Sequence, residues 1–156
     1  GLSMGLGIAM ALKTDESMAR VYVMLGDGEL EEGTVWEAVM TAPGFGVNNL
    51  VAILDCNKIQ KMDFVDKTIG SPQWSYKWRS FGWDVLETDG HDIEEFCKTV
   101  KCAQNGQKPT LIIAHTVKGK GVSIMENNPN WHFKLPNKKE LKIFKEELKI
   151  SDLELE

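Results

Sequence analysis

A carboxylate and an amide follow two apolar runs in this 156-residue chain. Asp27 stands between two glycines just after the run 20–25 (RVYVML), and Asn57 closes the stretch that begins with the run 50–54 (LVAIL). If the runs are parallel strands, their carboxyl ends meet at one edge of a sheet, so the two side chains can share one ion. Carboxylate and amide oxygens suit a hard cation such as Mg²⁺, with diphosphate oxygens and water completing the shell. The spacing therefore predicts a metal–diphosphate site.

The glycines beside Asp27 strengthen this interpretation. Gly26 and Gly28 allow the main chain to approach a ligand closely and to present N–H groups to diphosphate oxygens. Taken alone, a Gly-Asp-Gly sequence is most often a plain turn. The pattern is not a calcium-binding EF-hand, whose further acidic positions are missing, and no Gly-Lys-Ser/Thr follows to make a phosphate-binding P-loop. Gly5 and Gly7 do not complete a dinucleotide fingerprint, because no strand precedes them.

The elements that must position these residues alternate along the chain. We expect strands at 20–25, 50–54, 83–87 and 110–116, and helices at 3–13, 33–40, 75–81 and 93–104. Ser3 and Asp92 are candidate helix caps, and Pro43-Gly44 is expected to stop the helix that begins at Gly33. This alternation predicts an α/β domain with a mainly parallel sheet flanked by helices, in which ligands bind at the carboxyl ends of the strands.

The remaining segments have weaker patterns. Residues 58–74 lack clean periodicity and are expected to form an ordered loop, and a glycine-punctuated loop and a polar helix at about 138–149 end the chain. Glycines inside the first helix cost helix propensity, so we expect Gly5 and Gly7 to mark a close approach by a backbone or a ligand. The five tryptophans are expected to fill a core or an interface.

Composition excludes several classes of function. The net charge of −5 and the pI of about 5.3 give no basic footprint for nucleic acid. Lys118 and Lys120 form only a local basic spot, which suits one phosphorylated ligand. No apolar run reaches the ~20 residues that span a bilayer, and no signal peptide is recognisable. Three cysteines do not make a disulfide framework, so we expect a reduced, cytoplasmic setting.

Several motifs together resemble the thiamine-diphosphate enzymes, and most closely the transketolases. They are, in order, 26–33 (GDGELEEG), 36–38 (WEA), 49–59 (NLVAILDCNKI), 81–83 (FGW), 89–92 (DGHD), 116–121 (TVKGKG) and 130–132 (NWH). Their order and spacing are far more specific than any single motif. The likeness runs to about residue 135, and the stretches VKGKGVS and MENNPNWH look most like the N-terminal subunit of split transketolases.

The resemblance implies a diphosphate-binding domain over residues 1–135, followed by a C-terminal helix and tail over 136–156. Carried over, the side chains of Asp27 and Asn57 and the backbone carbonyl of Ile59 bind Mg²⁺, with Ca²⁺ or Mn²⁺ as possible substitutes. The implied thiamine-diphosphate contacts are Gly26, Asp27, Gly28, Glu29, Asn57, Ile59 and Lys118.

Three further residues gain roles from the resemblance. His132 matches a family histidine beside the reactive end of the cofactor, and an imidazole that titrates near neutrality can move a proton there. Glu32 and Glu37 match acidic positions that join a network across the subunit interface. Without the family they would be two glutamates on a solvated helix face. His91 is expected to be structural, in a turn, and His115 has no matched role.

The resemblance also implies what these residues do not contain. The family activates its cofactor with a glutamate on a separate pyrimidine-binding domain, and its diphosphate domain begins earlier, so we expect an N-terminally truncated piece that is inactive alone. A partner chain would supply the pyrimidine and C-terminal domains in a dimer or heterotetramer acting on sugar phosphates. The alternatives are a 1-deoxyxylulose-5-phosphate synthase-like enzyme, a non-catalytic assembly subunit of the same fold, and an unrelated nucleotide-binding domain.

Overall fold

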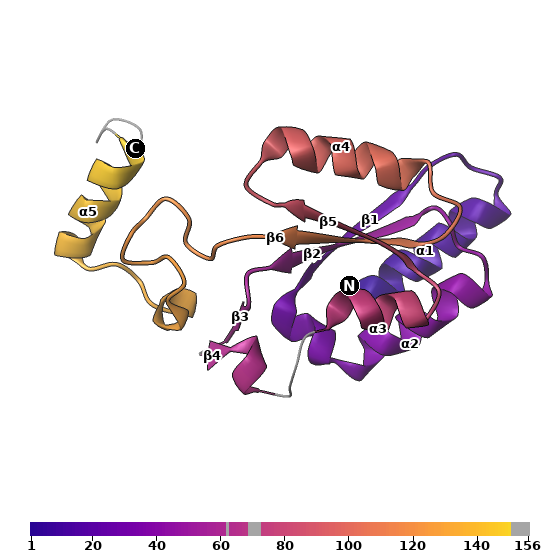
Figure 1. The fold of residues 1–156 in the computed structure, drawn as a ribbon, viewed down its shortest axis with the longest axis horizontal. Coiled ribbons are helices and arrows are strands. Elements are labelled where there is room, and N and C mark those ends of the chain that lie inside the picture. The colour runs from indigo at the N-terminus through magenta and orange to yellow at the C-terminus, as the bar shows by residue number, and fades with distance from the viewer. Residues whose placement is uncertain (62, 69–72, 151–156) are drawn as a thin grey trace.

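The computed structural model describes residues 1–61, 63–68 and 73–150. Its centre is a parallel sheet of four strands in the order β1-β2-β6-β5 (Figure 1). The strands are β1 (Val21–Gly26), β2 (Leu50–Cys56), β5 (Asp84–Asp89) and β6 (Thr110–His115). The central strands β2 and β6 are buried almost throughout, which explains why both are continuous apolar runs. The predicted parallel α/β fold is confirmed.

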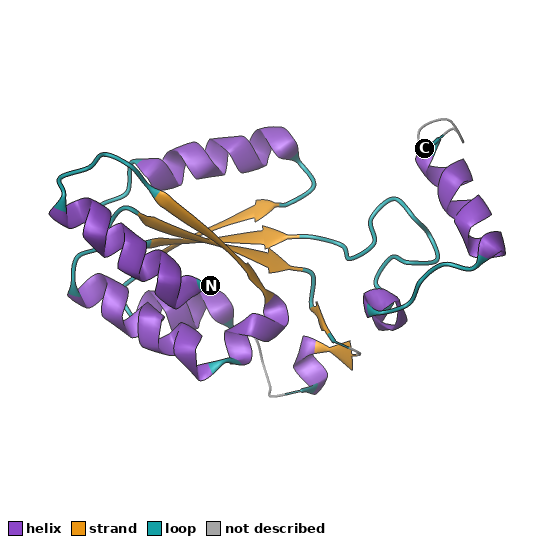
Figure 2. Ribbon diagram, turned by 180° about the vertical axis from the view of Figure 1, so that it is seen from behind, coloured by secondary structure: helices purple, strands orange, loops and turns teal. Residues whose placement is uncertain are grey.

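Helices cover both faces of the sheet, as Figures 1 and 2 show. One face carries α1 (Leu2–Thr14), α2 (Gly33–Gly44) and α3 (Trp74–Ser80), and the other carries α4 (Ile93–Gln104). The larger core lies on the first face and includes Leu54 and Trp78; the smaller one, around Ile112, lies beneath α4. The predicted cap of α4 is confirmed, because Asp92 Oδ1 accepts a hydrogen bond from the Glu95 N–H at 2.9 Å.

The packing of α1 on β1 explains one of the two glycines in this helix. A Cβ atom at Gly5 would collide with the Val23 side chain, so there is a close approach at this glycine, but it comes from a side chain of β1 and not from a backbone or a ligand as expected. At Gly7 the expectation was wrong, since nothing lies within 4 Å of a Cβ at that position. Ser3 does not cap the helix, which begins at Leu2. Its hydroxyl instead donates to the Thr34 carbonyl at 3.1 Å and ties α1 to α2.

The predicted stop at Pro43-Gly44 is confirmed, since α2 ends at Gly44, but the helix runs past the expected end at Met40 and includes Pro43, because another residue makes the hydrogen bond that proline cannot. Inside a helix, Pro43 has no N–H to donate to the carbonyl four residues earlier, that of Val39. The indole Nε1 of Trp83 donates to this carbonyl instead, at 2.8 Å. The buried acceptor is thereby satisfied, and α2 continues to Gly44.

The segment 58–74 is more structured than a loop. After β2 it forms a short antiparallel hairpin, β3 (Ile59–Gln60) and β4 (Asp63–Phe64), and a 3-10 turn, η2 (Val65–Lys67). Strands of two residues are too short to produce a recognisable alternation, which is why the prediction was wrong here. Residues 62 and 69–72 of the expected loop lie outside the described residues.

After β6 the chain leaves the sheet and forms what we call the arm, residues 116–150 (Figure 1). It contains a loop, a 3-10 turn η3 (Pro129–His132) and α5 (Lys138–Leu148), close to the helix expected at 138–149. The arm contacts the rest of the molecule at its start, beside the ends of the strands, and again where η3 lies against β3 and β4. Among the described residues, no helix is long and apolar enough to cross a membrane.

Candidate functional site

A pocket of about 560 Å³ opens at the carboxyl end of the sheet. Its walls come from the turn after β1, the end of β2, the β3–β4 hairpin and the arm. The lining residues are Gly26, Asp27, Gly28, Glu29, Glu31, Glu32, Asn57, Ile59, Gln60, Lys61, Lys118 and His132. The pocket therefore brings together every residue predicted to contact a metal or cofactor, although these residues are spread over more than one hundred positions.

Asp27 is the most deeply buried charged residue of this pocket, at 2% exposure. It begins the 3-10 helix η1 (Asp27–Glu31), and its Oδ2 accepts a hydrogen bond from the Lys58 N–H at 2.6 Å. Burial raises the pKa of this carboxyl, the Lys58 hydrogen bond opposes that shift, and the nearby negative charge of Asp55 raises the pKa further. A cation placed beside Asp27 would relieve both the desolvation and the repulsion.

The backbone at Lys58 holds an unusual conformation beside Asp27. Its φ of +64° lies in the left-handed region, which costs a non-glycine residue about 1–2 kcal/mol. This turn directs the Lys58 N–H at the Asp27 carboxylate and leads directly into β3. Strain of this kind often occurs at ligand sites, where the surroundings hold it in place.

The amide of Asn57 is held at both ends. Its Oδ1 accepts a hydrogen bond from the Ile59 N–H at 3.0 Å, and its Nδ2 donates to Asp55 Oδ2 at 3.2 Å. An amide oxygen has two lone pairs, so Asn57 Oδ1 can bind a cation while it accepts this hydrogen bond. Asp27, Asn57 and Ile59 line the same pocket, and their carboxylate, amide and main-chain carbonyl oxygens are the hard donors that Mg²⁺ or Ca²⁺ prefers.

Histidine, cysteine and acidic side chains alone do not form a metal centre here. In the described part of the chain, no group of three or more such residues is arranged to hold an ion. A metal in this pocket would therefore depend on the amide and main-chain oxygens, and on oxygens of a bound ligand. Cys56 is not a candidate nucleophile, since burial, with a smaller contribution from Asp27, raises the pKa of its thiol to about 12.

Three lining residues, Glu31, Gln60 and Lys61, were not predicted from the sequence. Gln60 Nε2 donates to Glu31 Oε1 at 2.9 Å and joins the hairpin to η1. A Cβ atom at Gly28 would lie 2.7 Å from Gln60 Oε1, so any larger residue here would have to displace the Gln60 side chain. Gln60 and Lys61 belong to a hairpin with no visible sequence pattern, and only the acidic run after Gly28 pointed to Glu31.

The arm contributes the two remaining lining residues, Lys118 and His132. Lys118 is half-buried, and its carbonyl accepts a hydrogen bond from the Asn127 N–H at 3.0 Å, which closes the loop on itself. His132 is exposed, and the edge of its ring packs on Phe133 with the centroids 4.5 Å apart. Both residues come from a segment outside the sheet, about one hundred positions after Asp27 in the sequence.

The other predicted residues lie at the margin of the pocket or beyond it. Glu32 lines the pocket and precedes the first turn of α2, whereas Glu37 is exposed on that helix and does not line it. Their interface roles stay predictions. His91 holds a turn, since its Nε2 accepts a hydrogen bond from the Val117 N–H at 2.7 Å. His115 Nε2 lies 2.9 Å from Glu87 Oε2 outside the pocket.

Comparison with known families and proteins shows what the chain is similar to. Residues 10–153 match the family described as transketolase, thiamine diphosphate binding domain. An apulose-4-phosphate transketolase subunit from Actinobacillus succinogenes is 40% identical over 149 residues, which are 96% of this chain and 54% of that protein. Human transketolase is 41% identical over 135 residues, 86% of this chain and 21% of that protein.

Solved structures give the same result for the fold. A crystal structure of transketolase from Campylobacter jejuni superimposes with a TM-score of 0.78 at 25% identity, over 99% of this chain and 31% of that one. The chain spans about half the length of the split-subunit relatives that it matches.

Proposed function

Since the chain belongs to the transketolase family and matches its thiamine-diphosphate-binding domain, we propose that it is the diphosphate-binding part of a two-chain transketolase. In this proposal the enzyme transfers a two-carbon ketol unit between sugar phosphates. The observation that carries the proposal is the pocket in which Asp27, Asn57 and Ile59, from two neighbouring strand ends, meet Lys118 and His132 from the arm.

The charge of the pocket supports a requirement for a divalent cation. Four carboxylates line it, from Asp27, Glu29, Glu31 and Glu32, against two lysine side chains. A diphosphate entering alone would meet a net negative surface. Mg²⁺ held by Asp27, Asn57 and the Ile59 carbonyl would offset this repulsion and bind the diphosphate oxygens.

The remaining lining residues would position the cofactor. The N–H groups around Gly26 and Gly28 would face phosphate oxygens, Glu29 would shape the turn by accepting from the Gly26 N–H, and Lys118 would add a positive charge. When bound, thiamine diphosphate supplies the electron sink for the carbanion that ketol transfer requires. His132 would donate a proton to, or accept one from, a substrate oxygen at the reactive end.

A partner chain completes the proposed enzyme. Relatives that are named as transketolase subunits support a division of the family's domains between two chains. These relatives include the apulose-4-phosphate proteins and a 39% identical 6-deoxy-6-sulfo-D-fructose transketolase subunit from a Clostridium strain. We therefore expect no sugar-phosphate turnover from these residues alone. Glu32 and Glu37, both exposed, would contribute to the contact between the two chains.

Calorimetry tests this proposal directly. The full-length protein is mixed with its partner chain and titrated with thiamine diphosphate, with Mg²⁺ and with EDTA. We expect binding only with the metal, and an affinity at least about 100-fold weaker in Asp27→Asn. Losing a residue that binds the metal directly should weaken binding at least as much as losing a residue that only supports such a ligand. Asp15→Asn, an exposed aspartate at the end of α1, is the matched control and should bind normally.

The alternatives give different results in the same experiment. A folded complex that binds no thiamine diphosphate would contradict the proposal and favour a chain kept for assembly alone. Turnover of pyruvate with glyceraldehyde 3-phosphate, in place of a ketose donor, would indicate a 1-deoxyxylulose-5-phosphate synthase-like reaction.

A further inference from the structure

We propose that Asp55 is a positioning residue that orients the Asn57 amide for a divalent cation, and that Thr116 holds Asp55 for this task. The inference rests on the proposed function, because it takes Asn57 as a metal ligand. It adds a second layer to the site: a carboxylate that does not touch the metal but determines which end of the amide faces it.

The geometry around Asp55 shows both of its oxygens in use. Asp55 lies near the end of β2, where it is half-buried and pairs in register with Gly26 of β1 and Ala114 of β6. Its Oδ2 accepts from Asn57 Nδ2 at 3.2 Å, and its Oδ1 accepts from the Thr116 hydroxyl. Asp55 therefore bridges the proposed ligand to the end of the neighbouring strand.

An asparagine ligand needs this support because the two ends of its amide have almost the same shape. Rotation by half a turn would replace the oxygen with an NH₂ group, which cannot bind a cation. In Asn57 both ends are specified: Nδ2 faces the Asp55 carboxylate and Oδ1 faces the Ile59 N–H. The rotated amide would set oxygen against carboxylate and NH₂ against N–H, two repulsive contacts in place of two hydrogen bonds.

Thr116 is itself firmly placed. Its N–H donates to the Cys56 carbonyl at 3.3 Å, so the start of the arm continues the pairing of β6 with β2. On the other side, the Gly90 N–H donates to the His115 carbonyl at 2.8 Å, and a Cβ atom at Gly90 would collide with the Thr116 methyl group. Thr116, whose hydroxyl holds Asp55, is thus positioned by contacts at the ends of β2, β5 and β6.

Asp55 lies behind Asn57 as seen from the cofactor pocket. It is not among the residues that line the 560 Å³ pocket, whereas Asn57 is. A separate pocket of about 420 Å³ at the sheet edge is lined by Asp55, Asn57 and Thr116. A residue with both oxygens engaged and its side chain outside the cofactor pocket is placed to support a ligand, not to be one.

The test measures Mn²⁺ as the probe metal, by electron paramagnetic resonance of the free ion, with thiamine diphosphate present and the full-length protein in complex with its partner. We expect Asp55→Ala to weaken Mn²⁺ binding about 10–100-fold, the usual effect of removing a supporting partner. Thr116→Val should weaken it in the same sense but less, and Thr116→Ser should restore it. Asp84→Ala, at the opposite end of the sheet, is the control.

The decisive comparison repeats Asp55→Ala in an Asn57→Asp background. A carboxylate has two equivalent oxygens, so its orientation need not be specified, and Asp55 then acts on the cation only through its negative charge. There we expect Asp55→Ala to weaken Mn²⁺ binding clearly less than it does with Asn57 in place. An equal loss in both backgrounds would overturn the inference, because it would show that Asp55 acts through its charge alone or as a direct ligand, and no loss with Asn57 in place would overturn it as well.

Folding is controlled separately, because a half-buried carboxylate is being removed. Circular dichroism and melting of each variant are compared with wild type, and Thr116→Val tests the same network without altering Asp55. Wild-type protein that binds no Mn²⁺ with thiamine diphosphate would overturn the proposed function and this inference together. Normal wild-type binding with an insensitive Asp55→Ala would overturn the inference alone.

Discussion

The body of the molecule, residues 1–115, and the arm, residues 116–150, are held together by different forces. In the body, apolar side chains are buried on both faces of the sheet, and the central strands have almost no exposure. The arm buries only Val122 and Trp131 among its described apolar side chains, and no residue of α5 is buried. Stability is therefore distributed unevenly between two parts of one chain.

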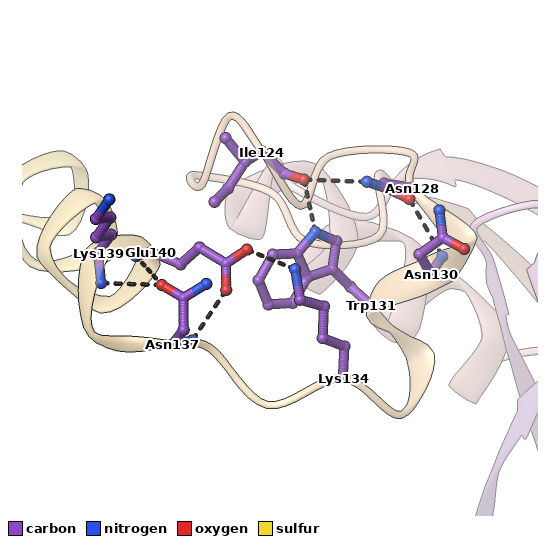
Figure 3. Close-up of polar contacts among 8 residues, drawn as sticks. All are labelled: Ile124, Asn128, Asn130, Trp131, Lys134, Asn137, Lys139 and Glu140. Carbon is purple, nitrogen blue, oxygen red and sulfur yellow. Dashed lines mark hydrogen bonds and ion pairs between the residues drawn. The ribbon is translucent and has the colours of Figure 1, made fainter.

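Polar contacts hold the arm together, as Figure 3 shows. The Ile124 carbonyl accepts from Asn128 Nδ2 at 3.3 Å and from Trp131 Nε1 at 2.7 Å. Asn137 caps α5, with the Glu140 side chain accepting in return from the Asn137 N–H at 2.9 Å. Because these contacts are exposed or only partly buried, the arm should open at a lower free energy than the sheet.

This difference separates two proposed tasks. The residues proposed to hold the metal, Asp27, Asn57 and Ile59, come from the body, whereas Lys118 and His132 come from the arm. A rigid sheet edge suits binding that must be precise, and a segment of low stability suits groups that must admit and release substrate. Binding and turnover should therefore be separable by mutation.

The largest effect is expected at His132. In the reconstituted complex, His132→Ala should lower kcat by about 10²–10⁴-fold, the usual contribution of an acid–base group, and change the thiamine-diphosphate affinity by less than about threefold. Steady-state kinetics and calorimetry measure the two quantities. His115→Ala, an exposed histidine outside the pocket, is the matched control. Equal losses of binding and turnover would contradict the separation.

A smaller effect should follow when the buried tryptophan of the arm is removed. Trp131 packs on Phe144 with ring centroids 5.4 Å apart, and its ring centroid lies 4.2 Å from the Lys134 ammonium. Trp131→Ala should raise amide hydrogen exchange in 122–148 by at least about tenfold while leaving β2 and β6 unchanged. Phe133→Ala, an exposed neighbour, should change neither. Faster exchange in the sheet would mean that the arm is no separate unit.

Lowering the pH should destabilise the folded arm, whereas protonation of Asp27 should stabilise the folded body. In the arm, the Lys134 hydrogen bond lowers the pKa of Glu140, and hydrogen bonds from Ser123 lower the pKa of Glu147. A glutamate whose pKa is lowered by folding stabilises the folded state at pH values above its ordinary pKa of about 4.3. This stabilisation is lost as the pH falls through the lower pKa of the folded state. In the body, the raised pKa of Asp27 has the opposite sign, so its protonation favours the fold.

We therefore expect the arm to loosen before the body as pH falls below about 4.3. Hydrogen exchange, corrected for its intrinsic pH dependence, measures protection in α5 and in β2 separately. The double variant Glu140→Gln, Glu147→Gln should have a loose arm already at pH 7 and a flat profile. Simultaneous loss of protection in both regions would refute the prediction.

The smallest effect concerns stability without ligands. Burial and the negative charge of Asp55 both disfavour the charged form of Asp27, so Asp27→Asn should raise the melting temperature of the metal-free protein at neutral pH by about 2–4 °C. Asp66→Asn, an exposed aspartate of η2, should leave it unchanged. Calorimetric melting with EDTA measures both, and the gain should vanish below the raised pKa of Asp27. A lower melting temperature would show that the charge stabilises the empty site.

The sequence predicted the parts of the structure that depend on local pattern. The strands were recognisable because they are apolar runs. Asp27 and Asn57 were recognisable as site residues because they follow two of these runs, and a parallel sheet places the carboxyl ends of its strands at one edge. The hairpin at Ile59 was not recognisable, since its two-residue strands are held by contacts with η1 and η3 and are too short to show alternation. Gln60 and Lys61 were missed for the same reason.

Roles that came from resemblance, such as that of His132, could not be obtained from physics alone. Nothing in an Asn-Trp-His sequence indicates that it will reach a sheet edge formed about one hundred residues earlier in the chain. The support of Asn57 by Asp55 was also invisible, because it depends on the hydroxyl of Thr116, which follows a different strand.

The hydrogen bond from Trp83 to the Val39 carbonyl makes two distant positions evolutionarily interdependent. With Pro43 present, Trp83→Phe would strand a buried acceptor, a loss of about 1–3 kcal/mol. After Pro43→Ala the helix can provide its own donor, and the same substitution costs only the lost packing of the buried indole against Trp78. A lineage would therefore lose the indole at a lower cost after losing the proline than before it, which favours one order of substitutions.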